Sequence, residues 1–263
     1  MQWEKLTYPD FKKAVKDSKK VCILPIGVIE KHSDHLPLGT DLLIAHTIAS
    51  LAAKKEKAVV FPYYYFSQIY EARHKAGTIS IKPKLLLALL ENVCDEIGRN
   101  GFEKIILLSG HGGNPAMLQY FVQTMLAEKK EYILYYPKEF YHEAKKVRGT
   151  VLVTTEDGHA GESETSSMLA FYEELVKKSC IQSKPGSSLK RLQHLPGFIT
   201  PVNWYADYPA HYCGDAGKGT RAKGEVLSKM YIDYVVKVIQ LVKKDKAVKK
   251  LYNEFFKACT HKF

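Results

Sequence analysis

Three short segments of this chain gather histidines and carboxylates at spacings suited to holding a metal ion. One segment, 30–41, offers five potential ligands within twelve residues, the second places a histidine among glycines, and the third sets a histidine and two glutamates ahead of a helix. The candidate ligands are Glu30, His32, Asp41, His111 and Glu162, with Asp34, His35, His159 and Glu164 close by in the sequence. Oxygen and imidazole donors without a nearby thiolate favour zinc, manganese or iron over calcium or an iron-sulfur cluster.

A carboxylate that bridges two ions would make this a two-metal centre, with ions about 3.5–4 Å apart. Such a centre lowers the pKa of a shared water, holds the resulting hydroxide at neutral pH and polarises a scissile carbonyl. Taken singly, Asp41 could cap a helix and Glu162 or Glu164 could favour a helix dipole. Helix capping and dipole effects do not explain why histidines gather after strands, so we predict a metal site and assign Asp34 and His35 to the turn.

Apolar runs of the kind found in buried strands precede all three segments, at 21–28, 104–109 and 151–155. Further strands are predicted at 59–61 and 132–136, a turn or short strand at 77–80, and helices after Thr7 and at 42–53, 85–97, 164–176 and 224–241. This alternation predicts an α/β fold whose mostly parallel sheet is covered by helices on both faces. The carboxyl ends of its strands would then bring the three segments together.

Length and composition narrow the class of protein. A chain of 263 residues, 46% of them hydrophobic, can bury a sizeable core, and we expect a single domain over 1–263. Five scattered cysteines argue for free thiols rather than a disulfide framework. With neither a signal peptide nor a long apolar stretch, we expect a cytoplasmic protein without a membrane partner. The net charge of +11 comes largely from short lysine pairs, so no nucleic-acid partner is expected.

The three segments resemble the signatures of the creatininase family of amidohydrolases. The matching motifs are E-x-H-x-x-H-L-P-L-G-T-D at 30–41, G-H-G-G-N at 110–114 and H-A-G-E-x-E-T at 159–165, with weaker similarity over most of the chain. The resemblance implies a three-layer α/β/α sandwich, hydrolysis of cyclic or small amides, two divalent metal ions per subunit and a homo-oligomer such as a hexamer.

Residue by residue, the resemblance implies that Glu30 and His111 hold one ion, that His32 holds the other and that Asp41 bridges them. The catalytic pair would be His159, as the acid-base residue, and Glu164 beside it. Creatininases carry a metal-binding glutamate two residues after the histidine that matches His111, but this chain has Gly113 there. We therefore predict that Glu162 supplies the missing ligand and that the chain lies in a branch that does not act on creatinine.

A second departure lies ahead of Gly77, where relatives often carry a Glu-His pair and this chain has Glu71 followed by Ala72. We predict a metal-dependent hydrolase in which a metal-bound hydroxide attacks a small, cyclic or related amide and His159 passes a proton to the leaving nitrogen. Formamide deformylation and peptide cleavage stay open, as does a non-catalytic protein that binds a metal or metabolite.

Overall fold

A parallel sheet forms the centre of the computed structural model, which describes residues 1–138 and 149–260. Within those ranges it has four strands in the order β2-β1-β3-β4. The central strand β1 (Val21–Ile26) pairs with β2 (Val59–Val60) and β3 (Lys104–Ser109), and β3 pairs with β4 (Ile133–Tyr135). All six residues of β1 are buried, as expected for a strand covered on both faces.

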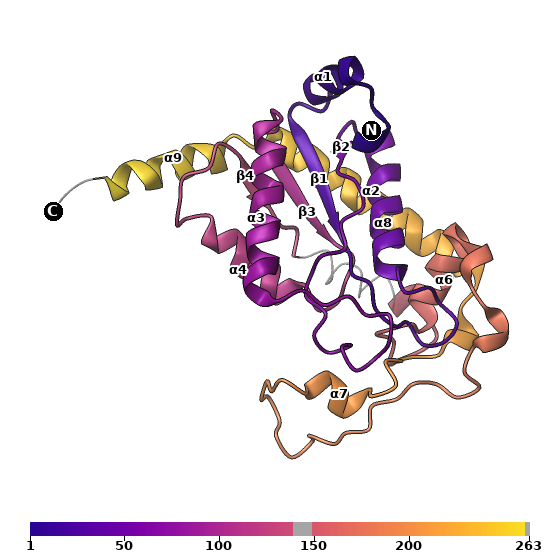
Figure 1. The fold of residues 1–263 in the computed structure, drawn as a ribbon. Helices are drawn as coiled ribbons and strands as arrows, with labels where there is room; N and C mark the ends of the chain where they lie inside the picture. The colour runs from indigo at the N-terminus through magenta and orange to yellow at the C-terminus, as the bar shows by residue number, and fades with distance from the viewer. Residues whose placement is uncertain (139–148, 261–263) are drawn as a thin grey trace.

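Helices cover both faces of the sheet, and successive side chains along each strand alternate between them. Leu24 and Leu107 join one core with α1 (Tyr8–Asp17), α3 (Pro83–Arg99) and α4 (Pro115–Thr124). Ile23 and Ile106 join the opposite core with α2 (Thr40–Lys55) and α8 (Arg221–Lys244). In Figure 1, α3 and α4 lie over the near face and α8 passes behind the sheet. The predicted three-layer α/β/α arrangement is confirmed.

The remaining helices lie mostly beyond the carboxyl ends of the strands. Helix α6 (Glu162–Phe171) packs along α8, and the short α7 (Asn203–Asp207) stands apart at the lower edge of Figure 1. Other helical elements of the described residues include α9 (Ala247–Cys259) and the 3₁₀ turns Trp3–Lys5, Glu173–Leu175, Lys178–Cys180 and Ala216–Lys218. None of the helices in the described ranges has both the length and the apolar character needed to cross a membrane.

Two glycines let the start of α2 approach the strand ends closely. A Cβ on Gly27, just after β1, would lie 2.5 Å from the Cα of Leu42. A Cβ on Gly110, just after β3, would lie 2.7 Å from the carbonyl oxygen of Asp41. Because no larger residue would fit at either position, these glycines allow the first turn of α2, with Asp41, to lie against both strand ends.

The expected strand at 151–155 is wrong, because residues 152–154 belong to no strand or helix. The N–H groups of Val153 and Thr154 donate to the carboxylate of Glu162 instead of to a neighbouring strand. The helix expected at 164–176 begins at Glu162 and ends at Phe171, and a 3₁₀ turn follows it. The other predicted strands and helices are present, with bounds shifted by a few residues.

Candidate metal centre

A buried cluster of carboxylates and imidazoles lies where the loops after β1 and β3 meet the start of α6. Three overlapping groups within it offer ligand atoms that all lie within 4.8 Å of one another. Two of these groups share Asp41, which is 3% exposed on the first turn of α2. The prediction that distant segments meet at one edge of the sheet is therefore confirmed.

The first group joins Glu30, Asp41 and His111. His111 Nδ1 lies 2.9 Å from Asp41 Oδ2 and 2.9 Å from Glu30 Oε1. Glu30 Oε1 is buried, and among the described residues its contact is the ion pair with the ring nitrogen of His111 rather than a regular hydrogen bond. A buried carboxylate oxygen left this way is costly unless a cation or donor satisfies it, which suits a metal position.

The second group joins His32, Asp41 and Glu164. His32 Nε2 lies 3.1 Å from Asp41 Oδ1 and 3.7 Å from Glu164 Oε2. On the other edge of the ring, His32 Nδ1 lies 3.2 Å from the carbonyl oxygen of Glu30. Since a carbonyl can only accept, Nδ1 carries the hydrogen, and in the neutral ring Nε2 is left as the ligand atom.

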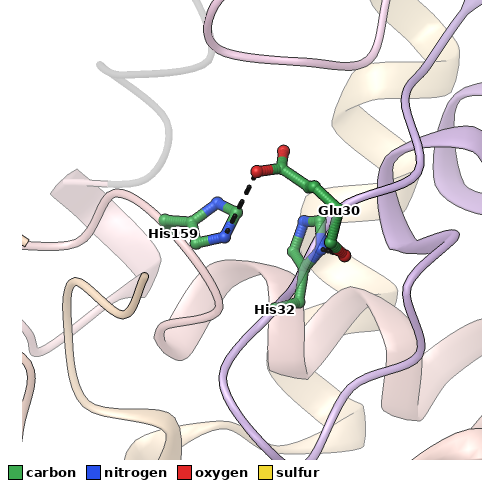
Figure 2. Close-up of side chains that lie close together, drawn as sticks. All are labelled: Glu30, His32 and His159. Atoms are coloured by element: carbon green, nitrogen blue, oxygen red, sulfur yellow. Dashed lines mark hydrogen bonds and ion pairs between the residues drawn. The ribbon is translucent and has the colours of Figure 1, made fainter. Parts of the chain in front are cut away.

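The third group joins His159, from the loop before α6, to Glu30 and His32. His159 Nε2 lies 3.8 Å from Glu30 Oε2, and its ring centroid is 4.3 Å from that of His32 (Figure 2). Nε2 also donates to the carbonyl oxygen of Lys31 at 2.7 Å. This bond places the hydrogen on Nε2 and leaves Nδ1 as the basic nitrogen of the neutral ring.

The carboxylates set the protonation of the imidazoles. Burial alone would lower the pKa of His32, but Asp41 and Glu164 outweigh it and raise that pKa to about 10. The pKa of His111 is likewise raised despite burial, because Glu30 and Asp41 face it. Burial and the nearby His32 lower the pKa of His159 to about 3. Without metal ions, protons on His32 and His111 therefore balance the carboxylates, whereas His159 is neutral.

The structure does not bring Glu162 to this cluster. Glu162 accepts hydrogen bonds from the N–H groups of Val153 and Thr154 and pairs with Lys223, so its carboxylate is engaged in joining three segments of the fold. The carboxylate that does enter the cluster is Glu164, whose Oε2 also accepts the N–H of Ala160 at 2.6 Å.

The two residues assigned to the turn stay outside the three groups. His35 Nε2 lies 2.8 Å from the hydroxyl of Thr165, and Asp34 pairs with Lys31 at 2.8 Å and accepts from Gln182. These contacts join the 30–41 loop to the start of α6 and to the loop after it. They agree with a structural role for both residues.

Sequence reasoning missed His211, which is 1% exposed and lies beside Glu30. Trp204 of α7 donates its Nε1–H to His211 Nδ1 at 3.1 Å, so Nε2 must carry the hydrogen of the neutral ring. That Nε2 donates to Glu30 Oε2 at 2.5 Å. His211 holds a φ of 58°, a conformation that is uncommon outside glycine. No motif marked it, because it follows a loop rather than a strand.

Glu71 was also absent from the site predicted from the sequence. Its Oε1 lies 3.7 Å from His111 Nε2, on the ring edge opposite the cluster. Together with Trp204, Glu71 and His211 line a cavity of about 210 Å³ that opens onto Asp41 and His159. The site thus offers ligand atoms, a neutral histidine and space for a small molecule in one place.

Comparison with known protein families finds a match over most of the chain. Residues 4–239 match the family model Creatininase, described as creatinine amidohydrolase. Creatinine amidohydrolase of Pseudomonas putida is 24% identical over 250 residues, which cover 89% of this chain and 94% of that protein. Mycofactocin precursor peptide peptidase of Mycobacterium ulcerans is 26% identical over 233 residues, or 82% of this chain and 83% of that one.

Solved structures share the fold. A Bacteroides fragilis protein with 25% identity superimposes with a TM-score of 0.79, covering 94% of this chain and 97% of its own. Creatininase structures described as Zn-Zn type and as Mn are 20% identical, with TM-scores of 0.73; they cover 93% of this chain, and 98% and 99% of their own.

Proposed function

Because the chain belongs to the creatininase family, we propose that it is a metal-dependent amidohydrolase that cleaves a C–N bond in a small amide. The observation that carries this proposal is the pair of buried ligand groups that share Asp41, which could bridge two ions. The ligands would be Glu30 and His111 for one ion, His32 and Glu164 for the other, and Asp41 for both. Glu164 thus takes the place that the sequence had suggested for Glu162.

When bound, the ions would activate a water molecule and polarise the carbonyl of the amide. The ligand set fits divalent zinc, manganese or iron, because it combines carboxylate oxygens with imidazole nitrogens and contains no thiolate. Three carboxylates in these groups, with Glu71 nearby, would offset the charge of two dications. Creatininase is known in zinc and manganese forms, and this supports the same choice of ions here.

His159 would move the proton. In the neutral ring its Nδ1 can accept a proton from water, while the bond from Nε2 to the Lys31 carbonyl fixes the ring. The protonated ring can then pass that proton to the leaving nitrogen, which avoids expelling a strongly basic amide anion. Burial, together with the nearby His32, lowers the pKa of His159 and so keeps the ring neutral in the metal-free protein.

A small amide suits the cavity, whose volume of about 210 Å³ leaves little room for a folded partner. The homo-oligomer, the cytoplasmic location and the absence of a nucleic-acid partner stay predictions. A non-catalytic protein of the same family would need the same ligands but would have no use for a neutral, positioned His159.

Metal analysis followed by turnover assays tests the proposal. The metal-loaded protein should hydrolyse at least one member of a panel of cyclic amides, formamides and short peptides, and chelation should abolish the activity. His159→Ala should lower kcat by about 10²–10⁴-fold while metal content stays unchanged. Exposed His194 provides the matched control, and His194→Ala should leave kcat unchanged.

Equal and negligible turnover by the chelated and the loaded protein, over the whole panel, would contradict the enzymatic proposal. If His159→Ala instead keeps full turnover, the proton-transfer role is wrong even though the metal site stands. Which class of amide is cleaved decides among cyclic amidohydrolase, deformylase and peptidase.

A further inference from the structure

Glu71 sits in a loop that is fastened to the second ligand segment. Ser67 in this loop donates to the side-chain oxygen of Asn114 at 2.6 Å, and Gln68 Nε2 donates to Glu71 Oε2 at 2.8 Å. With Oε2 occupied by the amide, Glu71 Oε1 is the oxygen that faces His111 Nε2, at 3.7 Å. The carboxylate is 20% exposed and carries a lowered pKa, since contacts with His111 and Gln68 outweigh the effect of burial.

The glycine at position 113 makes room for this arrangement. A Cβ there would lie 2.5 Å from His111 Nε2 and 2.7 Å from both Glu71 Oε1 and Gln68 Oε1. A Cβ on the preceding Gly112 would meet nothing within 4 Å. The two adjacent glycines therefore differ sharply: only Gly113 leaves space that other side chains use.

We propose that Glu71 is the positioning carboxylate of the metal site: it occupies the side-chain space left by Gly113 and forms an ion pair with the Nε2–H edge of His111 across 3.7 Å. The inference rests on the proposed function, because it requires His111 Nδ1 to face an ion. An imidazole that binds through Nδ1 must carry its hydrogen on Nε2, and a carboxylate on that hydrogen fixes the ring and makes Nδ1 more basic.

The geometry separates this role from that of a ligand. Glu71 belongs to none of the three ligand groups found among the described residues. It faces the ring edge of His111 opposite to the edge that approaches Glu30 and Asp41. The side-chain space beside Gly113 is therefore used by a residue that acts through His111.

Zinc affinity, measured on the full chain by competition with a chromophoric chelator, tests the inference without any substrate. Glu71→Gln keeps the size of the side chain but removes its charge, and it should weaken zinc binding by about 10–100-fold. Gly113→Ala should weaken it to a similar extent, because its Cβ displaces Glu71 and Gln68 from His111. Gly112→Ala is the matched control and should bind zinc like the unmodified protein.

The double variant Glu71→Gln/Gly113→Ala sharpens the test. Both changes remove the same contact, so the double variant should bind zinc no more weakly than the weaker single variant. Thermal unfolding of the metal-free proteins shows whether each variant folds, and Gly113→Ala still tests the idea if Glu71→Gln does not.

Three results would overturn the inference. They are zinc binding by Glu71→Gln at the level of the unmodified protein, equal losses for Gly112→Ala and Gly113→Ala, or losses that add in the double variant. An unchanged zinc affinity with a raised KM would make Glu71 a substrate contact instead. If the unmodified protein itself fails to bind zinc, manganese or iron, the proposed function fails, which is a different outcome from failure at Glu71 alone.

Discussion

Replacing His211 with glycine removes the hydrogen-bond donor that holds Glu30 in place. Glycine readily adopts the positive φ of this position, so the backbone conformation can stay the same. His211 Nε2 donates to Glu30 Oε2, and Glu30 Oε1 lies in the first ligand group beside His111. Without that donor, the buried carboxylate can rotate and must find another partner for Oε2. We therefore expect His211→Gly to weaken metal binding.

The size of the effect follows from the type of bond. A hydrogen bond to a charged group contributes about 1.5–3 kcal/mol, and each 1.4 kcal/mol corresponds to about tenfold in affinity. His211→Gly should therefore weaken the binding of one ion by about 10–100-fold, as removal of a group that orients a ligand does elsewhere. His211→Ala removes the same donor but retains the φ of 58°, so it should bind metal equally weakly and be less stable by about 1 kcal/mol or more.

Chelator competition for affinity and denaturant unfolding of the metal-free proteins separate the two effects. Lys190 is the matched control, because it is exposed, lies in the loop before α7 and has a φ of 51°. Lys190→Gly should leave metal affinity unchanged. The reasoning is refuted if both variants of His211 bind metal like the unmodified protein, or if Lys190→Gly weakens binding as much as they do.

Three further outcomes follow from the structure. Glu162→Gln should lower the free energy of unfolding by about 1–3 kcal/mol, since it removes the charge from a part-buried ion pair with Lys223, but it should leave the metal content unchanged. Glu164→Gln should lower the metal content instead, and metal analysis with unfolding curves decides between the two residues. Burial lowers the pKa of His35 to about 4 from an ordinary 6.5, so the unfolded chain takes up a proton at this residue at a higher pH than the folded chain does. The free energy of unfolding should therefore fall by up to about 3 kcal/mol as the pH drops from 6.5 towards 4. His35→Gln should flatten this pH dependence in urea titrations, and an unchanged pH dependence would contradict the assignment. Gly224→Ala would place a Cβ 1.9 Å from a backbone oxygen of α6 and should cost several kcal/mol or prevent folding, whereas the exposed Glu225→Ala on the same helix should change the melting temperature little.

The parts of the site that sequence predicted well are those attached to regular elements. Glu30 and His111 follow continuous apolar strands, and Asp41 opens a helix, so the rule that ligands gather at the carboxyl ends of parallel strands placed them together. The structure also brings His159 and Glu164 beside them, where the family resemblance had pointed.

The choice between Glu162 and Glu164 could not be made from the sequence. Successive residues of an α-helix are rotated by about 100°, so side chains two positions apart point in very different directions. Which of them faces the ligands depends on how α6 packs against α8, and the contact of Lys223 with Glu162 settles that orientation. The same bonds to Glu162 explain why the apolar run at 151–155 forms no strand.

Glu71 and His211 escaped prediction for a different reason. Both lie in irregular loops, whose path is fixed by individual contacts such as the bond from Trp204 to His211, rather than by a periodic pattern. Only the folded chain brings His211 to the second oxygen of Glu30 and Glu71 to the far ring edge of His111.

The wide spread of the cluster along the chain has a consequence for biosynthesis. The ribosome delivers Glu30 and Asp41 early and His111 later, yet Glu164 and His211 emerge only after well over half of the 263 residues have been made. Until then the nascent chain lacks Glu164, and it also lacks His211, which bonds to Glu30 in the folded protein. The proposed pair of cations would therefore find its full ligand set only after α6 has been made, and a truncated product that ends before α6 would lack Glu164.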